Sequence, residues 1–116
     1  MTFRHSVAVV LALVLVPAPV FAGWTGTASW YGHALARRRT ANGERFDPHA
    51  LTCAHRTLPF GTRLRLTNLE KGRSVLVRIN DRGPWYLDRE LDVSLAVARR
   101  LGMVTRGVVP LSITRL

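Results

Sequence analysis

The sequence has 116 residues, a hydrophobic fraction of 47%, one cysteine and a formal net charge of +10 at pH 7. The single cysteine excludes an internal disulfide, and it also excludes the usual zinc clusters built from several cysteines. His33, His49 and His55 lack the spacing of metal ligands, so we expect neither a metal nor a cofactor.

The basic residues are all arginines except Lys71, and arginine suits bidentate contacts with carboxylates or phosphates. They are spread along the chain rather than gathered on one predicted helix. We therefore expect an anionic polymer outside the cytoplasm as the partner, and no nucleic acid. The alternative is that the arginine content reflects only base composition and solubility.

Residues 1–22 have the pattern of a secretory signal peptide. A basic start at Arg4 precedes an apolar run over 6–16, followed by prolines and small residues up to Ala22. A retained membrane anchor is the alternative, but the run is shorter than the roughly 20 residues of a bilayer span. We expect cleavage after Ala22, no stable membrane span afterwards, a periplasmic or secreted location, and one domain over 23–116.

The rest of the chain alternates short β-patterned segments with turn residues, and it contains one helical segment. Ser94 is typical of a helix N-cap and Gly102 of a left-handed position after the last turn, which predicts a helix over 95–101. Because a closed sheet has no free edges, a small barrel is the expected fold. The six predicted strands span 26–32, 51–55, 62–68, 75–80, 91–94 and 107–116.

The strand over 75–80 is followed by Asp81, Arg82, Gly83 and Pro84, where a regular strand cannot continue. This break places a carboxylate at the rim of a rigid element, so Asp81 is the predicted chemical centre. The alternative is that the polar groups at this turn only bind backbone.

Several other residues are candidates on weaker grounds. Trp30 and Tyr31 point to opposite faces of the first strand, so one of them is expected to line a groove. An Asn-Gly turn presents Glu44 and Asp47 in a loop. Cys53 is expected to be buried, with a reactive thiol as the alternative.

Four sequence segments, closed by L-D-V-S at 91–94, together resemble the rare lipoprotein A family of septal lytic transglycosylases. The segments are G-T-A-S-W-Y-G at 26–32, T-A-N-G-E-R-F-D at 40–47, L-T-C-A-H-R-T-L-P-F-G-T at 51–62 and V-R-I-N-D-R-G-P-W at 77–85.

The resemblance implies a mainly β fold: a small six-stranded double-psi β-barrel with one short helix. It also implies cleavage of the β-1,4 bond between N-acetylmuramic acid and N-acetylglucosamine in peptidoglycan glycan strands, preferentially strands without stem peptides. The products would carry 1,6-anhydro-muramyl ends. Division or cell-wall machinery would be possible partners. The sequence differs from the family in Cys53, where alanine is usual, and in lacking a lipid-attachment cysteine at the signal cut.

Carried over residue by residue, the resemblance implies catalytic roles for Asp81, Glu44, Asp47 and His55. Asp81 is the first candidate for the general acid and Glu44 the second, while Asp47 and His55 would orient the groove. Such an acid must be protonated near neutral pH, which requires burial or a neighbouring carboxylate. The candidate substrate-binding residues are Trp30, Tyr31, Asn42, Asn80, Arg82, Trp85 and Arg89, with Arg82 or Arg89 holding acidic or acyl groups.

Two other functions remain open from the sequence. The first is a non-catalytic, expansin-like module that binds cell-wall glycans, and the second is a small glucan hydrolase with the same barrel. The products formed from peptidoglycan would separate the three.

Overall fold

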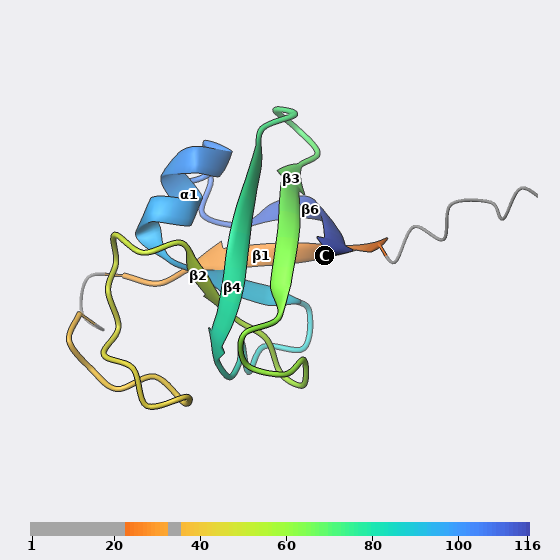
Figure 1. Ribbon diagram of the computed structural model, residues 1–116. Coiled ribbons are helices and arrows are strands. Elements are labelled where there is room, and N and C mark those ends of the chain that lie inside the picture. Colours follow the sequence, from red (N-terminus) through yellow and green to blue (C-terminus); the bar gives the residue numbers. More distant parts are fainter. Residues whose placement is uncertain (1–22, 33–35) are drawn as a thin grey trace, which may run out of the picture.

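The computed structural model describes residues 23–32 and 36–116, and it contains six strands and one helix (Figure 1). The predicted signal peptide, residues 1–22, lies outside the described residues. The elements are β1 (Gly23–Trp30), β2 (Thr52–Ala54), β3 (Arg63–Asn68), β4 (Ser74–Asp81), β5 (Leu91–Val93), α1 (Leu95–Leu101) and β6 (Val109–Arg115).

The six strands form a closed barrel in the order β1-β5-β2-β4-β3-β6. Two of the pairings, β1 with β5 and β2 with β4, are parallel, and the other four are antiparallel. This arrangement confirms the prediction of a mainly β, six-stranded barrel with one short helix. No helix among the described residues is long and apolar enough to span a membrane.

The barrel interior is filled by the alternating apolar residues of the strands. In β4, Val75, Val77 and Ile79 are buried, whereas Leu76 on the other face is exposed. Cys53 of β2 is fully buried and free, as predicted, and its burial raises the pKa of the thiol to about 12. The thiol is therefore protonated at neutral pH and serves as a small apolar core residue.

Helix α1 begins and ends at the predicted residues. The Ser94 hydroxyl accepts a hydrogen bond from the Val97 amide at 3.3 Å, and Gly102 adopts a left-handed φ of 68°. The buried face of the helix, which includes Val97, Ala98 and Leu101, closes the core beside β4.

Strand β1 differs from its predicted range, because it begins at Gly23 rather than at residue 26. The three additional residues pair with Thr114, Ile113 and Ser112 of β6, so the longer strand follows from the reach of its partner. Glycine and threonine in this stretch gave only a weak local strand signal.

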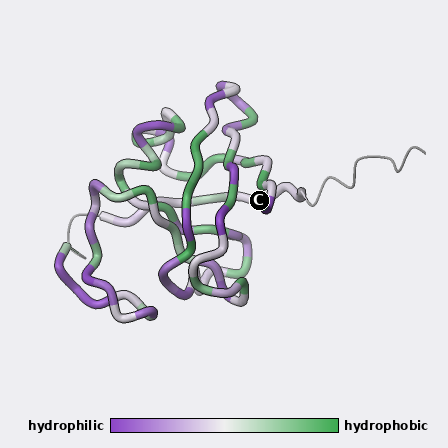
Figure 2. Tube along the Cα trace, in the orientation of Figure 1, coloured by the Kyte–Doolittle hydropathy of each residue, from purple (hydrophilic) through white to green (hydrophobic). Residues whose placement is uncertain are grey.

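The segment 36–50, named the lobe below, extends from the barrel beside β2 and β4 (Figure 1). Most of the lobe is hydrophilic, in contrast to the hydrophobic stretches of the strands (Figure 2). It is fixed by backbone hydrogen bonds between Arg37 and Phe46 and between Phe46 and Arg38, and by a bridge between Arg39 and Arg45. The side chain of Phe46 is buried.

Candidate functional site

Asp81, the last residue of β4, lies where the lobe meets the barrel rim. Its Oδ1 accepts hydrogen bonds from the backbone amides of Ala41 and Arg82, both at 2.9 Å, and its Oδ2 accepts one from the Tyr31 hydroxyl at 3.1 Å. These three donors come from the lobe, from the turn after β4 and from the segment after β1. They fix the carboxylate while leaving it partly exposed.

A second carboxyl group, Asp92 of β5, lies on the other side of β2. Ala54 of β2 pairs with Asp81 of β4 and also with Asp92 of β5, so the two acidic residues flank the same residue. Because neighbouring strands are about 4.8 Å apart, their Cα atoms are separated by roughly 10 Å. Asp92 Oδ1 accepts a hydrogen bond from the Ser29 hydroxyl at 3.0 Å.

The protonation of Asp92 is controlled mainly by burial. Burial raises the pKa of its carboxyl above the ordinary range, and the negative charge of Asp81 acts in the same direction. The hydrogen bond from Ser29 and the charge of Arg89 oppose this increase without cancelling it. Of the two carboxyls beside Ala54, Asp92 is the one for which burial favours the protonated form.

Sequence reasoning missed Asp92 as a site residue, although it noted L-D-V-S as the end of the family pattern. One local signal was available, because Leu91 and Val93 are apolar and the polar side chain between them must face away from the core. Its proximity to Asp81 depends on strand register, which the sequence does not contain.

Tyr31 donates a hydrogen bond to Asp81 and also lies near Asp92. Burial, together with the nearby charges of Asp81 and Asp92, raises the pKa of the Tyr31 hydroxyl well above its ordinary value of 10.0. Tyr31 therefore remains a hydrogen-bond donor to Asp81. Its ring packs edge-on against Phe46, with ring centroids 5.1 Å apart, which ties the lobe to this part of the barrel.

These residues line an open cavity of about 460 Å³. Trp85 and Tyr86 form part of its wall, and their side chains are mostly exposed, Trp85 to 75%. Flat aromatic groups beside paired carboxyls are well suited to a carbohydrate, because sugar rings stack on aromatic faces. The lining residues are Tyr31, Asp81, Arg82, Gly83, Pro84, Trp85, Tyr86, Arg89 and Asp92.

Glu44, the second candidate for the general acid, is held in an ion pair. Its carboxylate accepts hydrogen bonds from both terminal nitrogens of Arg78, at 2.5 and 2.7 Å, and from the Asn42 amide at 2.7 Å. The bonds from Arg78 and then from Asn42 lower the pKa of Glu44 to about 2. Glu44 is therefore ionised at neutral pH in this arrangement, which does not favour a role as proton donor.

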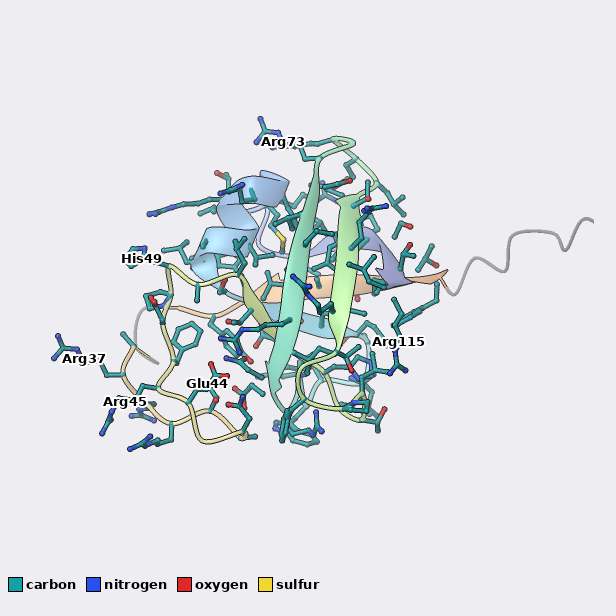
Figure 3. All side chains as sticks on the ribbon, in the orientation of Figure 1. Arg37, Glu44, Arg45, His49, Arg73 and Arg115 are labelled. Carbon is teal, nitrogen blue, oxygen red and sulfur yellow. The ribbon has the colours of Figure 1, made fainter. Side chains whose placement is uncertain are left out.

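Figure 3 shows Glu44 between the lobe and β4, whereas Arg37 and Arg45 extend from the outer side of the lobe. Asn42 and Asn80, two of the predicted substrate-binding residues, take part in the same network. The side-chain amide of Asn80 donates a hydrogen bond to Glu44 at 3.4 Å, and the backbone amide of Asn42 donates one to the backbone carbonyl of Asn80. The network joins the lobe to β4.

Asp47 and His55 do not line the cavity beside Asp81. Asp47 accepts a hydrogen bond from the His49 amide at 2.8 Å and thereby stabilises a local turn. The buried His55 ring accepts two backbone amide hydrogen bonds at Nδ1, while its Nε2 contacts Glu90 at 2.9 Å. Both side chains are thus engaged elsewhere, and the expected orienting contacts with the groove are not formed.

Three further predicted substrate-binding residues, Trp30, Arg82 and Arg89, have different surroundings. Trp30 packs against the core, and Arg82 donates to the carbonyls of His55 and Leu58. Arg89 stacks on Tyr86 with its guanidinium carbon 4.8 Å from the ring centroid. The Nε of Arg89 is buried, and it has no hydrogen-bond partner within the described part of the chain.

The sequence of this chain and its fold are both similar to those of known proteins. The family model described as lytic transglycolase matches residues 24–113. A probable endolytic peptidoglycan transglycosylase RlpA of a Synechocystis species is 60% identical over 72% of this chain and 26% of that protein. The endolytic peptidoglycan transglycosylase RlpA of Pseudomonas aeruginosa is 52% identical over 71% of this chain and 24% of that protein.

This chain therefore spans about a quarter of the length of these two relatives. Among solved structures, the Streptomyces papain inhibitor matches with a TM-score of 0.66 and 21% identity. The match covers 84% of this chain and 97% of the inhibitor, and at this identity it supports the barrel fold alone.

Proposed function

Because this chain belongs to the lytic transglycolase family of double-psi β-barrels, we propose that it cleaves peptidoglycan glycan strands by intramolecular transglycosylation. The observation that carries this proposal is the open cavity in which Asp81 and the partly buried Asp92 face the same space beside Trp85 and Tyr86. The bond cleaved is the β-1,4 bond between N-acetylmuramic acid and N-acetylglucosamine.

The proposed reaction uses one carboxyl group twice. Protonated Asp92 donates its proton to the glycosidic oxygen while the bond to the muramyl C1 breaks. The muramyl C6 hydroxyl oxygen then bonds to C1, and its proton returns to Asp92. No water enters the reaction, so the new end is a 1,6-anhydro-muramyl residue.

Asp81 has a different role in this scheme. Positive charge develops at the muramyl C1 and ring oxygen in the transition state. A fixed carboxylate that needs no reorganisation stabilises such charge. The hydrogen bonds from Tyr31, Ala41 and Arg82 supply that fixation. In this scheme the proton donor is Asp92, and not Asp81 as the sequence suggested.

Substrate binding follows from the cavity wall. The exposed rings of Trp85 and Tyr86 would stack on sugar rings, and the Arg89 side chain, which lines the same cavity, would contact an acyl group of the glycan. Glu44 and its partners would hold the lobe against β4. A substrate of this kind implies a location outside the cytoplasm, in agreement with the signal-like pattern of residues 1–22.

The experiment is product analysis after incubation of the purified protein with amidase-treated peptidoglycan. We expect anhydro-muramyl ends with the unmodified protein, and a loss of about 100-fold or more in rate with Asp92→Asn. Asp92→Asn is nearly isosteric, and a thermal unfolding curve checks that it folds. New reducing ends would instead identify a hydrolase, and bound strands without new ends would identify a binding module.

A further inference from the structure

A second cavity adjoins Asp81 on the side of the lobe. It has a volume of about 250 Å³ and is lined by Arg38, Arg39, Thr40, Phe46 and Asp81. The first cavity, with Tyr31 and Trp85, also includes Asp81. Asp81 therefore borders two cavities: the first contains three aromatic side chains together with Arg82 and Arg89, and the second contains Arg38 and Arg39.

The backbone that carries these two arginines is held in place relative to Asp81. The Phe46 amide donates to the Arg38 carbonyl at 2.6 Å, and Arg39 forms a bridge with Arg45. Two residues after Arg39, the Ala41 amide donates directly to Asp81. The distance from this pair of arginines to the reacting position is thus set by the fold of the lobe.

The arginines of this cavity have no carboxylate partner in the part of the chain that the structure describes. Arg38 and Arg39 form no ion pair there, and Arg39 uses one terminal nitrogen to contact the Gly43 carbonyl. Of the two lobe carboxylates, Glu44 is paired with Arg78, and Asp47 accepts a hydrogen bond from the His49 amide without forming an ion pair with either arginine. The small cavity is therefore bordered by two positively charged side chains, and Asp81 is the one acidic residue in its lining.

The sequence suggested Arg82 or Arg89 as the residue that holds acidic or acyl groups, but both side chains make other contacts. Arg82 donates to two backbone carbonyls and stacks on Phe60 with its guanidinium carbon 3.9 Å from the ring centroid. Arg89 stacks on Tyr86 in the aromatic cavity. Both arginines line the first cavity, but their guanidinium groups already make these contacts, whereas Arg38 and Arg39 are the arginines of the second cavity.

We propose that Arg38 and Arg39 bind the lactyl carboxylate of a muramyl residue adjacent to the bond that is cleaved. The proposal rests on the proposed function and specifies its substrate. When a stem peptide is attached, this carboxyl carbon is part of a neutral amide, and it carries a charge only after the peptide is removed. Guanidinium groups recognise a carboxylate bidentately but gain little from an amide. The small cavity fits a sugar substituent.

The experiment compares two forms of the same stripped glycan. In one form the lactyl carboxylates are free, and in the other they are converted to methylamides. We expect the unmodified protein to prefer the free carboxylate about tenfold in kcat/KM, mainly through KM. The double variant Arg38→Gln, Arg39→Gln should lose this preference by cleaving the free-carboxylate glycan less efficiently, with the methylamide glycan unaffected.

The control is the double variant Arg73→Gln, Arg115→Gln, which removes the same charge at sites away from the lobe (Figure 3). It should retain the preference. Equal cleavage of both glycans by the unmodified protein, or an equal loss on both glycans in the lobe variant, would overturn the proposal.

If neither glycan yields anhydro-muramyl ends, the proposed function fails, and the arginine site is then judged by binding alone. In that case, fluorescence anisotropy with labelled glycans of both forms should still show the preference and its loss in the lobe variant. Equal affinity for both forms would reject the arginine site.

Discussion

Asp81 and Asp92 are the same residue type on two sides of Ala54, yet their environments are opposite. Asp81 receives hydrogen bonds from two backbone amides and a tyrosine, whereas Asp92 receives one from Ser29, and both are partly buried. Burial raises the pKa of Asp92, which makes the two carboxyls candidates for different roles. The sequence analysis placed Asp81 first, and the barrel brings Asp92 to the other side of the same β2 residue.

Glu44 provides a prediction about stability and pH. Its folded-state pKa, about 2, lies below the ordinary value of 4.5, so its ion pair stabilises the fold fully above pH 4.5. This stabilisation is lost as the pH falls from about 4.5 through about 2. Glu44→Gln should lower the free energy of unfolding by less than about 1 kcal/mol at neutral pH, because the pair is partly exposed.

Urea unfolding at several pH values measures this difference, which should shrink as the solution becomes more acidic. Glu70→Gln is the matched control, since the Glu70 side chain has the same exposed fraction, 38%, but contacts Arg106 only once, at 3.3 Å. A Glu44→Gln effect that is equal at all pH values would contradict the assignment.

At the scale of elements, Gly26 allows β1 to pack closely against Glu90, in the segment before β5. A Cβ atom at this position would lie 2.6 Å from the Glu90 Cβ and 2.9 Å from its Cγ. Glu90 in turn accepts hydrogen bonds from the Trp24 indole and from Arg56, and it contacts His55. The glycine therefore allows a partly buried polar cluster to pack against the strand.

Gly26→Ala should destabilise the protein by roughly 1–3 kcal/mol, because either Glu90 or the strand must move. Gly32→Ala is the control, because no atom lies within 4 Å of its added Cβ. Thermal unfolding of both variants tests the contact. A similar melting temperature for the two alanine variants would show that Glu90 moves without cost.

Local patterns predicted the elements well because their causes are local. The cap residues of α1, the alternation in β4 and the buried Cys53 all follow from neighbours in the sequence. The site was only partly predictable. Asp81 follows from the break after β4, but the position of Asp92 and the pairing of Glu44 with Arg78 depend on contacts between distant segments. His55 and Asp47 were assigned through resemblance, and their side chains are held by other partners.

For the whole molecule, the net charge of +10 predicts opposite effects of salt on folding and on substrate binding. Mutual repulsion of the arginines disfavours the compact state, and salt screens it. Salt equally screens the attraction to a polymer that carries carboxylates. Raising NaCl from about 20 mM to about 300 mM should therefore increase the melting temperature and also increase KM for stripped glycan.

Circular dichroism melting and initial-rate measurements in the same buffers test this. A neutral osmolyte at equal osmolality controls for changes in water activity. If KM stayed constant while the melting temperature rose, charge would affect folding without contributing to recognition of the polymer.

The pairing of Gly23 with Thr114 brings both ends of the described barrel together, on the side opposite the lobe (Figure 1). A bead, a dye or a display scaffold attached at Leu116 would therefore leave the lobe unobstructed. The same closeness permits a short peptide bridge between the two ends, with a new opening cut at the hairpin between β3 and β4. Such a rearranged chain would retain all six strand pairings.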